Sequence, residues 1–177
     1  MNAWSGRTMD GLFGVVIDGA QLLAMHGMCS AAGGVETGGI LIGRYSDDGA
    51  VAHVTEVTPA PADSTRGATW FVRGVAGLRA ALARRWKGKV RTYYLGEWHY
   101  HPVATVVPSH DDFRQMGLIA TADAYRCREP LLLILGAAGK EGGERSTRVF
   151  VCPVGREPCE FICSAATPGA RHGTTEP

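Results

Sequence analysis

The chain has 177 residues, of which 45% are apolar and 20% charged, and its formal net charge is +1. This length supports one domain with a substantial core, and the composition is that of a folded globular protein. The balanced charge, with no basic stripe expected, argues against nucleic acid or an anionic membrane as a partner. The longest apolar run, 131–136, is too short to cross a bilayer, and residues 1–11 lack the regions of a secretory signal.

The cysteines predict a reducing, cytoplasmic setting. There are five, an odd number without the spacing of a disulfide framework. Cys152, Cys159 and Cys163 cluster near the C-terminus, but their spacing matches no common zinc knuckle. The sequence therefore predicts buried or idle thiols there and assigns them no role.

The first half of the chain mixes strand and helix patterns. Asp18 precedes a stripe of apolar residues at helical spacing and Gly33 follows it, which are start and stop signals of a helix. The predicted elements are a strand at 13–17, a helix at 19–31, strands at 36–45 and 50–58 joined by a turn at 47–49, a polar loop at 59–68, an extended segment at 69–73 and a helix at 75–87. The inward face predicted for this second helix consists of Val75, Leu78, Leu82 and Trp86.

The sequence of the second half of the chain predicts a buried central strand. Its elements are a strand at 92–101, a loop at 103–108, a helix from Ser109 to about Tyr125, a central strand at 130–135, a glycine-rich turn at 136–144 and strands at 148–154 and 160–163. Strands and helices mix without strict alternation, so an α+β (α/β/α) domain around one mixed sheet is expected. We assign it to residues 11–164, with an N-terminal extension at 1–10 and a disordered tail at 165–177.

Half of the six histidines lie in one stretch, EWHYHPVATVVPSHDD, from Glu97 to Asp112. Residues two apart on a strand share a face, so His99 and His101 should project side by side. Ser109 and Asp112 form the S-x-x-D pattern of a capping box, which places the carboxylate in the first turn of the next helix. Two histidines and one carboxylate are the ligand count of a catalytic zinc site, whereas structural sites fill all four positions.

This spacing resembles that of the JAB/MPN zinc metalloproteases, whose JAMM motif is a distant glutamate followed by H-x-H-x7-S-x2-D. The upstream glutamate is matched by Glu36, in the segment ETGGILIG at 36–43, and the resemblance spans about residues 13–154. It implies a cytidine-deaminase-like MPN/JAB domain, with a central mixed sheet flanked by helices, and one Zn²⁺ held by His99, His101 and Asp112. Tyr100 departs from the Ser or Thr that is usual in the family, but alternation should point it away from the metal.

The resemblance also assigns roles around the metal. Glu36 would be the general base and Ser109 the donor to the oxyanion. Glu97 shares the histidine face and is a rival base or a residue that orients a histidine. A slip of one residue would make Asp111 the ligand, although capping and family spacing favour Asp112.

Three further polar side chains remain open. His110 and Asp111 are expected to be exposed, with contact to the substrate as the alternative, and Tyr100 is kept as a candidate for supporting the site or contacting the substrate. His26, His53 and His172 are expected to be structural or solvated.

The family hydrolyses peptide or isopeptide bonds after the C-terminal glycine of ubiquitin-like proteins. The form GEWHYHP at 96–102 resembles a bacterial branch found beside E1-like and E2-like enzymes in antiphage operons, where it removes the conjugated partner from its target. The alternatives are a peptidase that processes sulfur-carrier proteins in cysteine or cofactor biosynthesis and a non-catalytic MPN scaffold. A DNA-repair role fits the balanced charge poorly.

Short loops at 59–68 and 136–144 would set the specificity. Loops this short favour recognition of the thin C-terminal tail of a substrate protein, which would bind as an added strand at a sheet edge.

Overall fold

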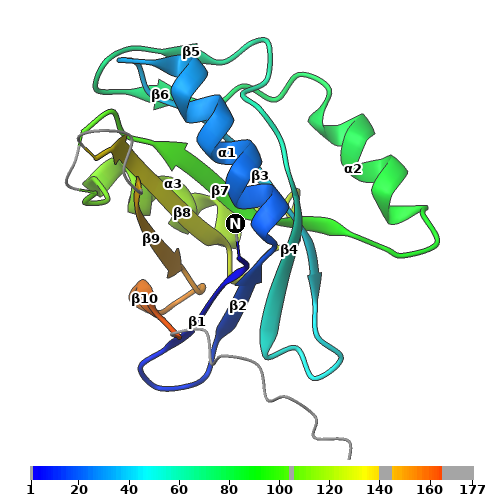
Figure 1. Cartoon of the computed structure of the whole chain (residues 1–177). Helices are drawn as coiled ribbons and strands as arrows, with labels where there is room; N and C mark the ends of the chain where they lie inside the picture. The colour runs from blue at the N-terminus through cyan, green and yellow to red at the C-terminus, as the bar shows by residue number, and fades with distance from the viewer. Residues whose placement is uncertain (1, 104–105, 140–144, 165–177) are drawn as a thin grey trace, which may run out of the picture.

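The computed structural model describes residues 2–103, 106–139 and 145–164, and its fold is α+β (Figure 1). The predicted tail at 165–177 and most of the turn predicted at 136–144 lie outside these residues. The elements in chain order are β1 (Trp4–Thr8), β2 (Gly14–Ile17), α1 (Gly19–Ala32), β3 (Thr37–Tyr45), β4 (Val51–Val57), β5 (Thr65–Arg66), β6 (Phe71–Val72), α2 (Leu78–Trp86), β7 (Tyr93–Tyr100), α3 (His110–Thr121), β8 (Leu131–Ala138), β9 (Arg145–Val151) and β10 (Cys159–Cys163).

The main sheet is mixed, as predicted, but it closes on itself. Its strand order is β1-β10-β9-β8-β7-β3-β4-β2, with β7–β8 and β2–β4 parallel and the other pairs antiparallel. The closure depends on β1, which lies in a segment where the sequence predicts no element and pairs with both β2 and β10. Because that pairing joins strands from the two ends of the chain, local periodicity does not reveal it.

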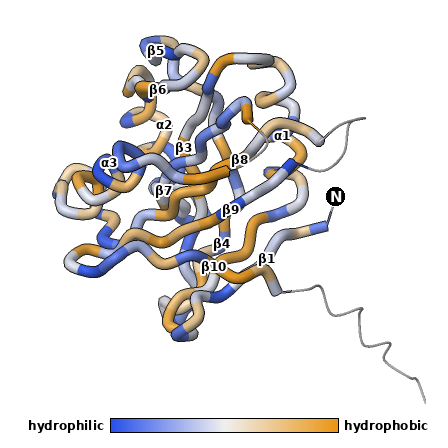
Figure 2. The backbone as a smooth tube through the Cα atoms, turned by 90° about the vertical axis from the view of Figure 1, so that its left-hand side faces the viewer, coloured by the Kyte–Doolittle hydropathy of each residue, from blue (hydrophilic) through white to orange (hydrophobic). Residues whose placement is uncertain are grey.

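The core has two parts, one on each face of the central strands. Inside the closed sheet, Leu22, Met25 and Cys29 of α1 pack with residues from β2 to β10. On the other face, Met116 and Ile119 of α3 pack against β3, β8 and β9. The predicted central strand is confirmed, because β8 contributes to both clusters and is hydrophobic along most of its length (Figure 2).

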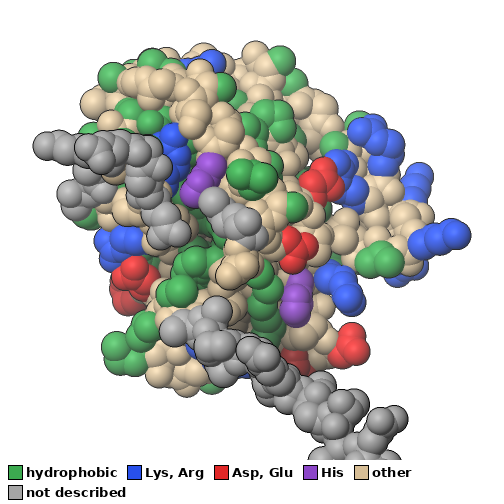
Figure 3. Space-filling model, viewed as in Figure 1, with side chains coloured by type: hydrophobic (Ala, Val, Ile, Leu, Met, Phe, Trp, Pro, Cys, Tyr) green, Lys and Arg blue, Asp and Glu red, His purple; other side chains and the backbone are tan. Residues whose placement is uncertain are grey.

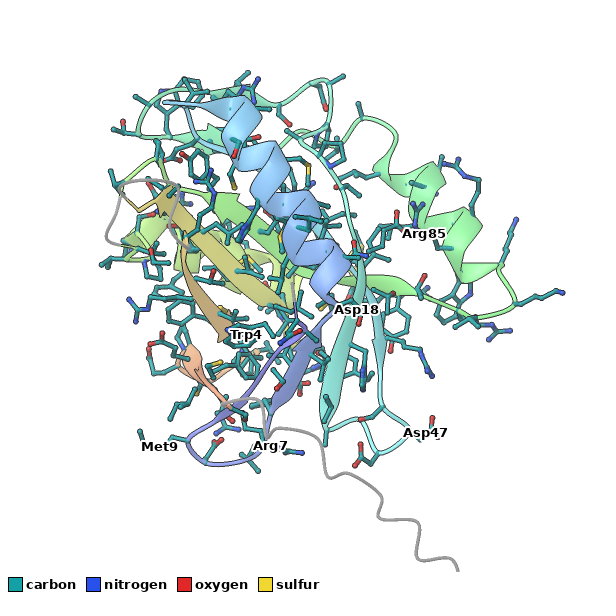
Figure 4. The ribbon with its side chains drawn as sticks, in the orientation of Figure 1. Trp4, Arg7, Met9, Asp18, Asp47 and Arg85 are labelled. Atoms are coloured by element: carbon teal, nitrogen blue, oxygen red, sulfur yellow. The ribbon has the colours of Figure 1, made fainter. Side chains whose placement is uncertain are left out.

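The helix α2 is shorter and more exposed than predicted. None of its residues is fully buried, and only Leu78 and Leu82 of the predicted inward face pack against the core. Val75 is 63% exposed and Trp86 is 51% exposed, so the expectation that they face inward is wrong. The helix stands to one side of the sheet, where Arg85 forms an ion pair with Glu56 of β4 (Figure 4).

Charge is distributed less evenly than the overall balance indicates. Residues 64–96 contain eight of the 18 Lys and Arg residues and none of the 17 Asp and Glu residues. Basic side chains therefore gather over α2, and the expectation of no basic stripe is wrong for this segment (Figure 3). None of the helices described is long and apolar enough to span a membrane.

The strand β7 carries an irregularity that sets the direction of its side chains. Its pairing with β3 shifts register opposite Leu41 and Ile42, next to Gly96, whose φ is 153°. A Cβ at Gly96 would lie 2.0 Å from the carbonyl oxygen of Leu131, so this position requires glycine. Beyond the shift, alternate residues face the barrel interior or the α3 side, and the α3 side carries the candidate site.

Candidate metal centre and active site

The three predicted metal ligands converge at the end of β7. The Nδ1 atom of His99 lies 2.8 Å from Oδ1 of Asp112, and Nε2 of His101 lies 3.8 Å from Oδ2 of Asp112. One ligand atom from each residue lies within 4.8 Å of the others, and no other such group of His, Cys, Asp or Glu occurs among the described residues. Two imidazole nitrogens and one carboxylate oxygen are donors that suit zinc.

The capping box predicted at the start of α3 is present and holds the Asp112 carboxylate. Oδ2 of Asp112 accepts hydrogen bonds from the backbone N–H of Ser109 at 2.6 Å and from its hydroxyl at 2.7 Å. The N–H of Asp112 in turn donates to Oγ of Ser109 at 3.1 Å. Burial opposes the charge of Asp112, but bonds from His99 and Ser109 outweigh it and lower the pKa of Asp112 to about 2.

The neighbouring residues His110 and Asp111 are exposed and do not belong to this group of candidate ligands. The side chain of Asp111 is 81% exposed and forms an ion pair with Arg114 at 3.2 Å. His110 is exposed in the first turn of α3. The structure therefore agrees with the motif alignment in which Asp112 is the ligand, and not with the alignment shifted by one residue to Asp111.

The helix α3 ends at Thr121, earlier than the predicted Tyr125.

His99 lies between two buried carboxylates. Its Nδ1 faces Asp112, and its Nε2 lies 3.4 Å from Oε2 of Glu97. Burial disfavours a charged ring, but the bonds to Asp112 and Glu97 outweigh it and raise the pKa of His99 to about 9. Among the residues that the structure describes, no carboxylate pairs with the Nδ1 atom of His101, and burial lowers the pKa of this histidine.

Glu36 enters the site from the residue before β3. Its backbone N–H donates to the carbonyl of Gly67 at 2.8 Å, and its side chain is half-buried. Burial and, after it, the negative charge of Asp112 raise the pKa of Glu36 to about 7, while His99 opposes the rise. Glu36 and the three candidate ligands line one cleft of about 390 Å³. The rest of the lining comprises Thr69, Trp70, Phe71, Val72, Arg73, Glu97, Ser109, Asp111, Arg114 and Gln115.

Sequence reasoning missed the wall of this cleft formed by the short β5–β6 hairpin. The ring of Phe71 packs edge-on against the His99 imidazole, with centroids 5.8 Å apart. Arg73 forms an ion pair with Glu97 at 2.7 Å. The available signal was the alternation of the extended segment at 69–73, because residues 71 and 73 share a face.

Tyr100 lies on the opposite face of β7, as alternation predicts. It is buried in the barrel interior, and its hydroxyl donates to the carbonyl of Gly33 at the end of α1 at 3.0 Å. The Arg145 guanidinium lies 5.3 Å from the centre of its ring. Tyr100 therefore ties α1 to β7 and does not line the cleft.

The C-terminal cysteines do not form a second candidate metal site. Cys152 is buried, Cys159 is half-buried and Cys163 is exposed, and all three are free thiols. The structure gives no metal-binding group among them within the described residues.

Comparisons with known proteins agree with this geometry. Residues 20–150 match the family model described as prokaryotic homologs of the JAB domain, a range that holds Glu36 and the three candidate ligands. A protein named CD-NTase/cGAS isopeptidase, from Enterobacter hormaechei subsp. hoffmannii, is 47% identical over 147 residues, which cover 83% of this chain and 79% of that protein. The solution structure of protein DSY2949 from Desulfitobacterium hafniense shares the fold at a TM-score of 0.60 and 20% identity, over 81% of this chain and 87% of that one. The chain belongs to the family of prokaryotic homologs of the JAB domain.

Proposed function

We propose that this protein is a zinc-dependent isopeptidase of the JAMM type. The observation that carries the proposal is the convergence of His99, His101 and Asp112 with Glu36 in one cleft. The 47% identity to a protein named CD-NTase/cGAS isopeptidase supports the same reaction. The complete set of side chains argues against a non-catalytic scaffold, which needs no metal ligands.

The donor set fits one zinc ion. His99, His101 and Asp112 would hold it, and three protein ligands are the number found in catalytic zinc sites. When bound, zinc supplies a Lewis acid and brings the pKa of water to about 7. Asp112 is suited to the role because it is already ionised and held by Ser109.

Glu36 is the general base in this proposal. A carboxylate with a pKa of about 7 can accept a proton and return it to a leaving amine at neutral pH. Glu97 is the weaker candidate, because it is 2% exposed and is held in an ion pair by Arg73. Its pKa is lowered, since bonds from His99 and Arg73 outweigh the effect of burial.

Ser109 is the proposed donor to the oxyanion. In this structure its hydroxyl donates to Asp112, so the role requires the hydroxyl hydrogen to turn toward the substrate. Loss of one oxyanion donor typically costs about 3 kcal/mol of transition-state stabilisation.

The proposed substrate is a thin C-terminal protein tail joined to a lysine amine. We assign the tail to a ubiquitin-like protein ending in glycine, within a cytoplasmic antiphage conjugation system that includes E1-like and E2-like enzymes. The name of the relative, CD-NTase/cGAS isopeptidase, suggests a CD-NTase/cGAS protein as one of the two proteins joined by the bond that is cleaved. Exposed Trp70 and Val72 beside the cleft offer an apolar wall to an extended tail.

The test is a cleavage assay on defined conjugates. Ubiquitin-like proteins with glycine tails, a sulfur-carrier protein and a CD-NTase would each be joined at the C-terminus to a lysine-containing reporter. Release by the wild type, blocked by a chelator and by Glu36→Gln, is expected, and the ranking of the tails identifies the substrate class. Preference for the sulfur carrier would move the protein to sulfur-carrier processing, and zinc binding without any release would contradict the isopeptidase.

A further inference from the structure

Arg73, which lines the cleft, makes hydrogen bonds to three different residues. Its Nε donates to Oε1 of Glu97 at 2.8 Å, and its terminal nitrogens reach the Tyr125 hydroxyl at 2.9 Å and the Gly74 carbonyl at 2.8 Å. Both members of the Arg73–Glu97 pair are buried, with side chains 6% and 2% exposed. A buried ion pair is costly to desolvate and is weak evidence for stability alone, so a functional reason for it is worth seeking.

The pair leads directly to a metal ligand. Oε1 of Glu97 is held by Arg73 and also accepts from the Tyr94 hydroxyl at 3.3 Å. This leaves the other oxygen, Oε2, to face Nε2 of His99 at 3.4 Å. Nδ1 of the same ring faces Asp112, so the two nitrogens have different partners.

We propose that Arg73 is a positioning residue for the metal centre: it holds Glu97, and Glu97 keeps His99 turned with Nδ1 toward Asp112. The inference rests on the proposed zinc site and goes beyond it by naming what orients one ligand. A neutral histidine can donate from one nitrogen only, and a carboxylate that accepts from Nε2–H leaves Nδ1 with the lone pair that a metal needs. Carboxylates that receive the second N–H of a histidine ligand are a common support of metal sites.

The same hairpin reaches His99 twice. Phe71 packs against the His99 ring. Arg73, two residues later, forms the ion pair with Glu97, whose carboxylate faces the same ring. The intervening Val72 is 60% exposed. The β5–β6 hairpin therefore presents one face to the ligand and the other to solvent, and the ligand orientation depends on how the hairpin is docked.

The experiment measures zinc affinity by competition with a chromophoric chelator for wild type, Arg73→Met, Glu97→Gln and the double variant. Arg85→Met is the matched control, because it removes a guanidinium from the Glu56 ion pair outside the cleft. Nitrogen-15 NMR of the His99 ring reports its tautomer in the zinc-loaded protein. Thermal unfolding of each variant separates stability from affinity.

We expect each single variant to weaken zinc binding about 10-fold or more, which is the effect typical of residues that support a ligand. The double variant should be no weaker than the poorer single variant, since both act through one contact. Arg85→Met should match the wild type, and the wild-type His99 should carry its proton on Nε2. If Arg73→Met does not fold, Arg73→Lys keeps the buried charge and should still show a smaller loss of affinity.

Two different results would count against these proposals, and each one contradicts a different proposal. Wild-type zinc affinity in Arg73→Met, with only a lower unfolding temperature, would make Arg73 a structural residue and leave the proposed function standing. A wild type that binds no zinc would overturn the proposed function itself.

Discussion

Ser109 and Asp112 hold each other in place by reciprocal hydrogen bonds. The N–H of Asp112 donates to Oγ of Ser109, while the N–H and hydroxyl of Ser109 donate to Oδ2 of Asp112. The start of α3 and the position of a candidate metal ligand are therefore one arrangement. A change that weakens the cap should also weaken the metal site.

Ser109→Ala tests this coupling. Loss of a serine N-cap typically costs about 1 kcal/mol of stability, and Asp112 also loses a donor that fixes its carboxylate. We expect a lower free energy of unfolding together with weaker zinc binding, while Ser109→Thr, which keeps a hydroxyl, retains most of both. Denaturant unfolding and a zinc titration check this, and a loss of stability at unchanged zinc affinity would show that the cap and the ligand are independent.

Zinc should stabilise the folded chain through the three converging side chains. At free zinc 100-fold above its dissociation constant, binding adds about 2.7 kcal/mol to the free energy of unfolding. We expect His101→Ala and Asp112→Ala to lose this zinc-dependent rise in unfolding temperature. Asp111→Asn alters the adjacent, exposed carboxylate and should keep it. Equal stabilisation of all the variants would place the ion elsewhere.

Glu36 should make the metal-free protein less stable as pH rises. Its folded pKa of about 7 lies above the ordinary value of 4.5, so between these values the folded state holds a proton that the unfolded state has released. Stability from this group is present below pH 4.5 and is lost as pH rises through 7. Metal-free Glu36→Gln should therefore match the wild type near pH 4.5 and exceed it at pH 8 in thermal unfolding. A pH-independent difference would contradict the raised pKa.

An added side chain should destabilise the fold at Gly38 but not at Gly27. A Cβ at Gly38 would lie 2.3 Å from the carbonyl oxygen of Trp98 and 2.8 Å from the Phe71 ring, next to His99. We expect Gly38→Ala to cost more than about 1 kcal/mol, because overpacking forces backbone shifts, and to weaken zinc binding. Gly27 is an exposed position of α1, where an added Cβ meets no atom within 4 Å outside the local helix backbone, so Gly27→Ala should gain about 0.5–1 kcal/mol. Chemical unfolding of the two variants makes the comparison.

The reactivity of the five cysteine thiols should depend on their burial. Desolvation raises the pKa of Cys29 to about 11 and that of Cys127 and Cys152 to about 12, so these thiols should not react at pH 8. Cys159 and Cys163 are more accessible. Alkylation with iodoacetamide followed by peptide mass spectrometry should label these two in the folded protein and all five after denaturation. Early labelling of Cys127 would contradict the packing around it.

Local sequence determined most of the candidate site. Alternation on β7 put His99 and His101 on one side and Tyr100 on the other, and the S-x-x-D pattern placed Asp112 in the first turn of α3. These inferences succeeded because side-chain direction on a strand and capping at a helix start depend on residues only two or three apart. The buried central strand β8 followed from its continuous apolar run in the same way.

Tertiary structure decided what depends on residues far apart in the chain. The closure of the barrel needs β1 to pair with β10, and the support of His99 needs Arg73 to meet Glu97 across 24 positions. The exposure of Trp86 depends on how α2 stands against the sheet, which its own apolar stripe does not specify. The pKa of Glu36 likewise depends on burial and on the charge of Asp112, both of which exist only in the folded chain.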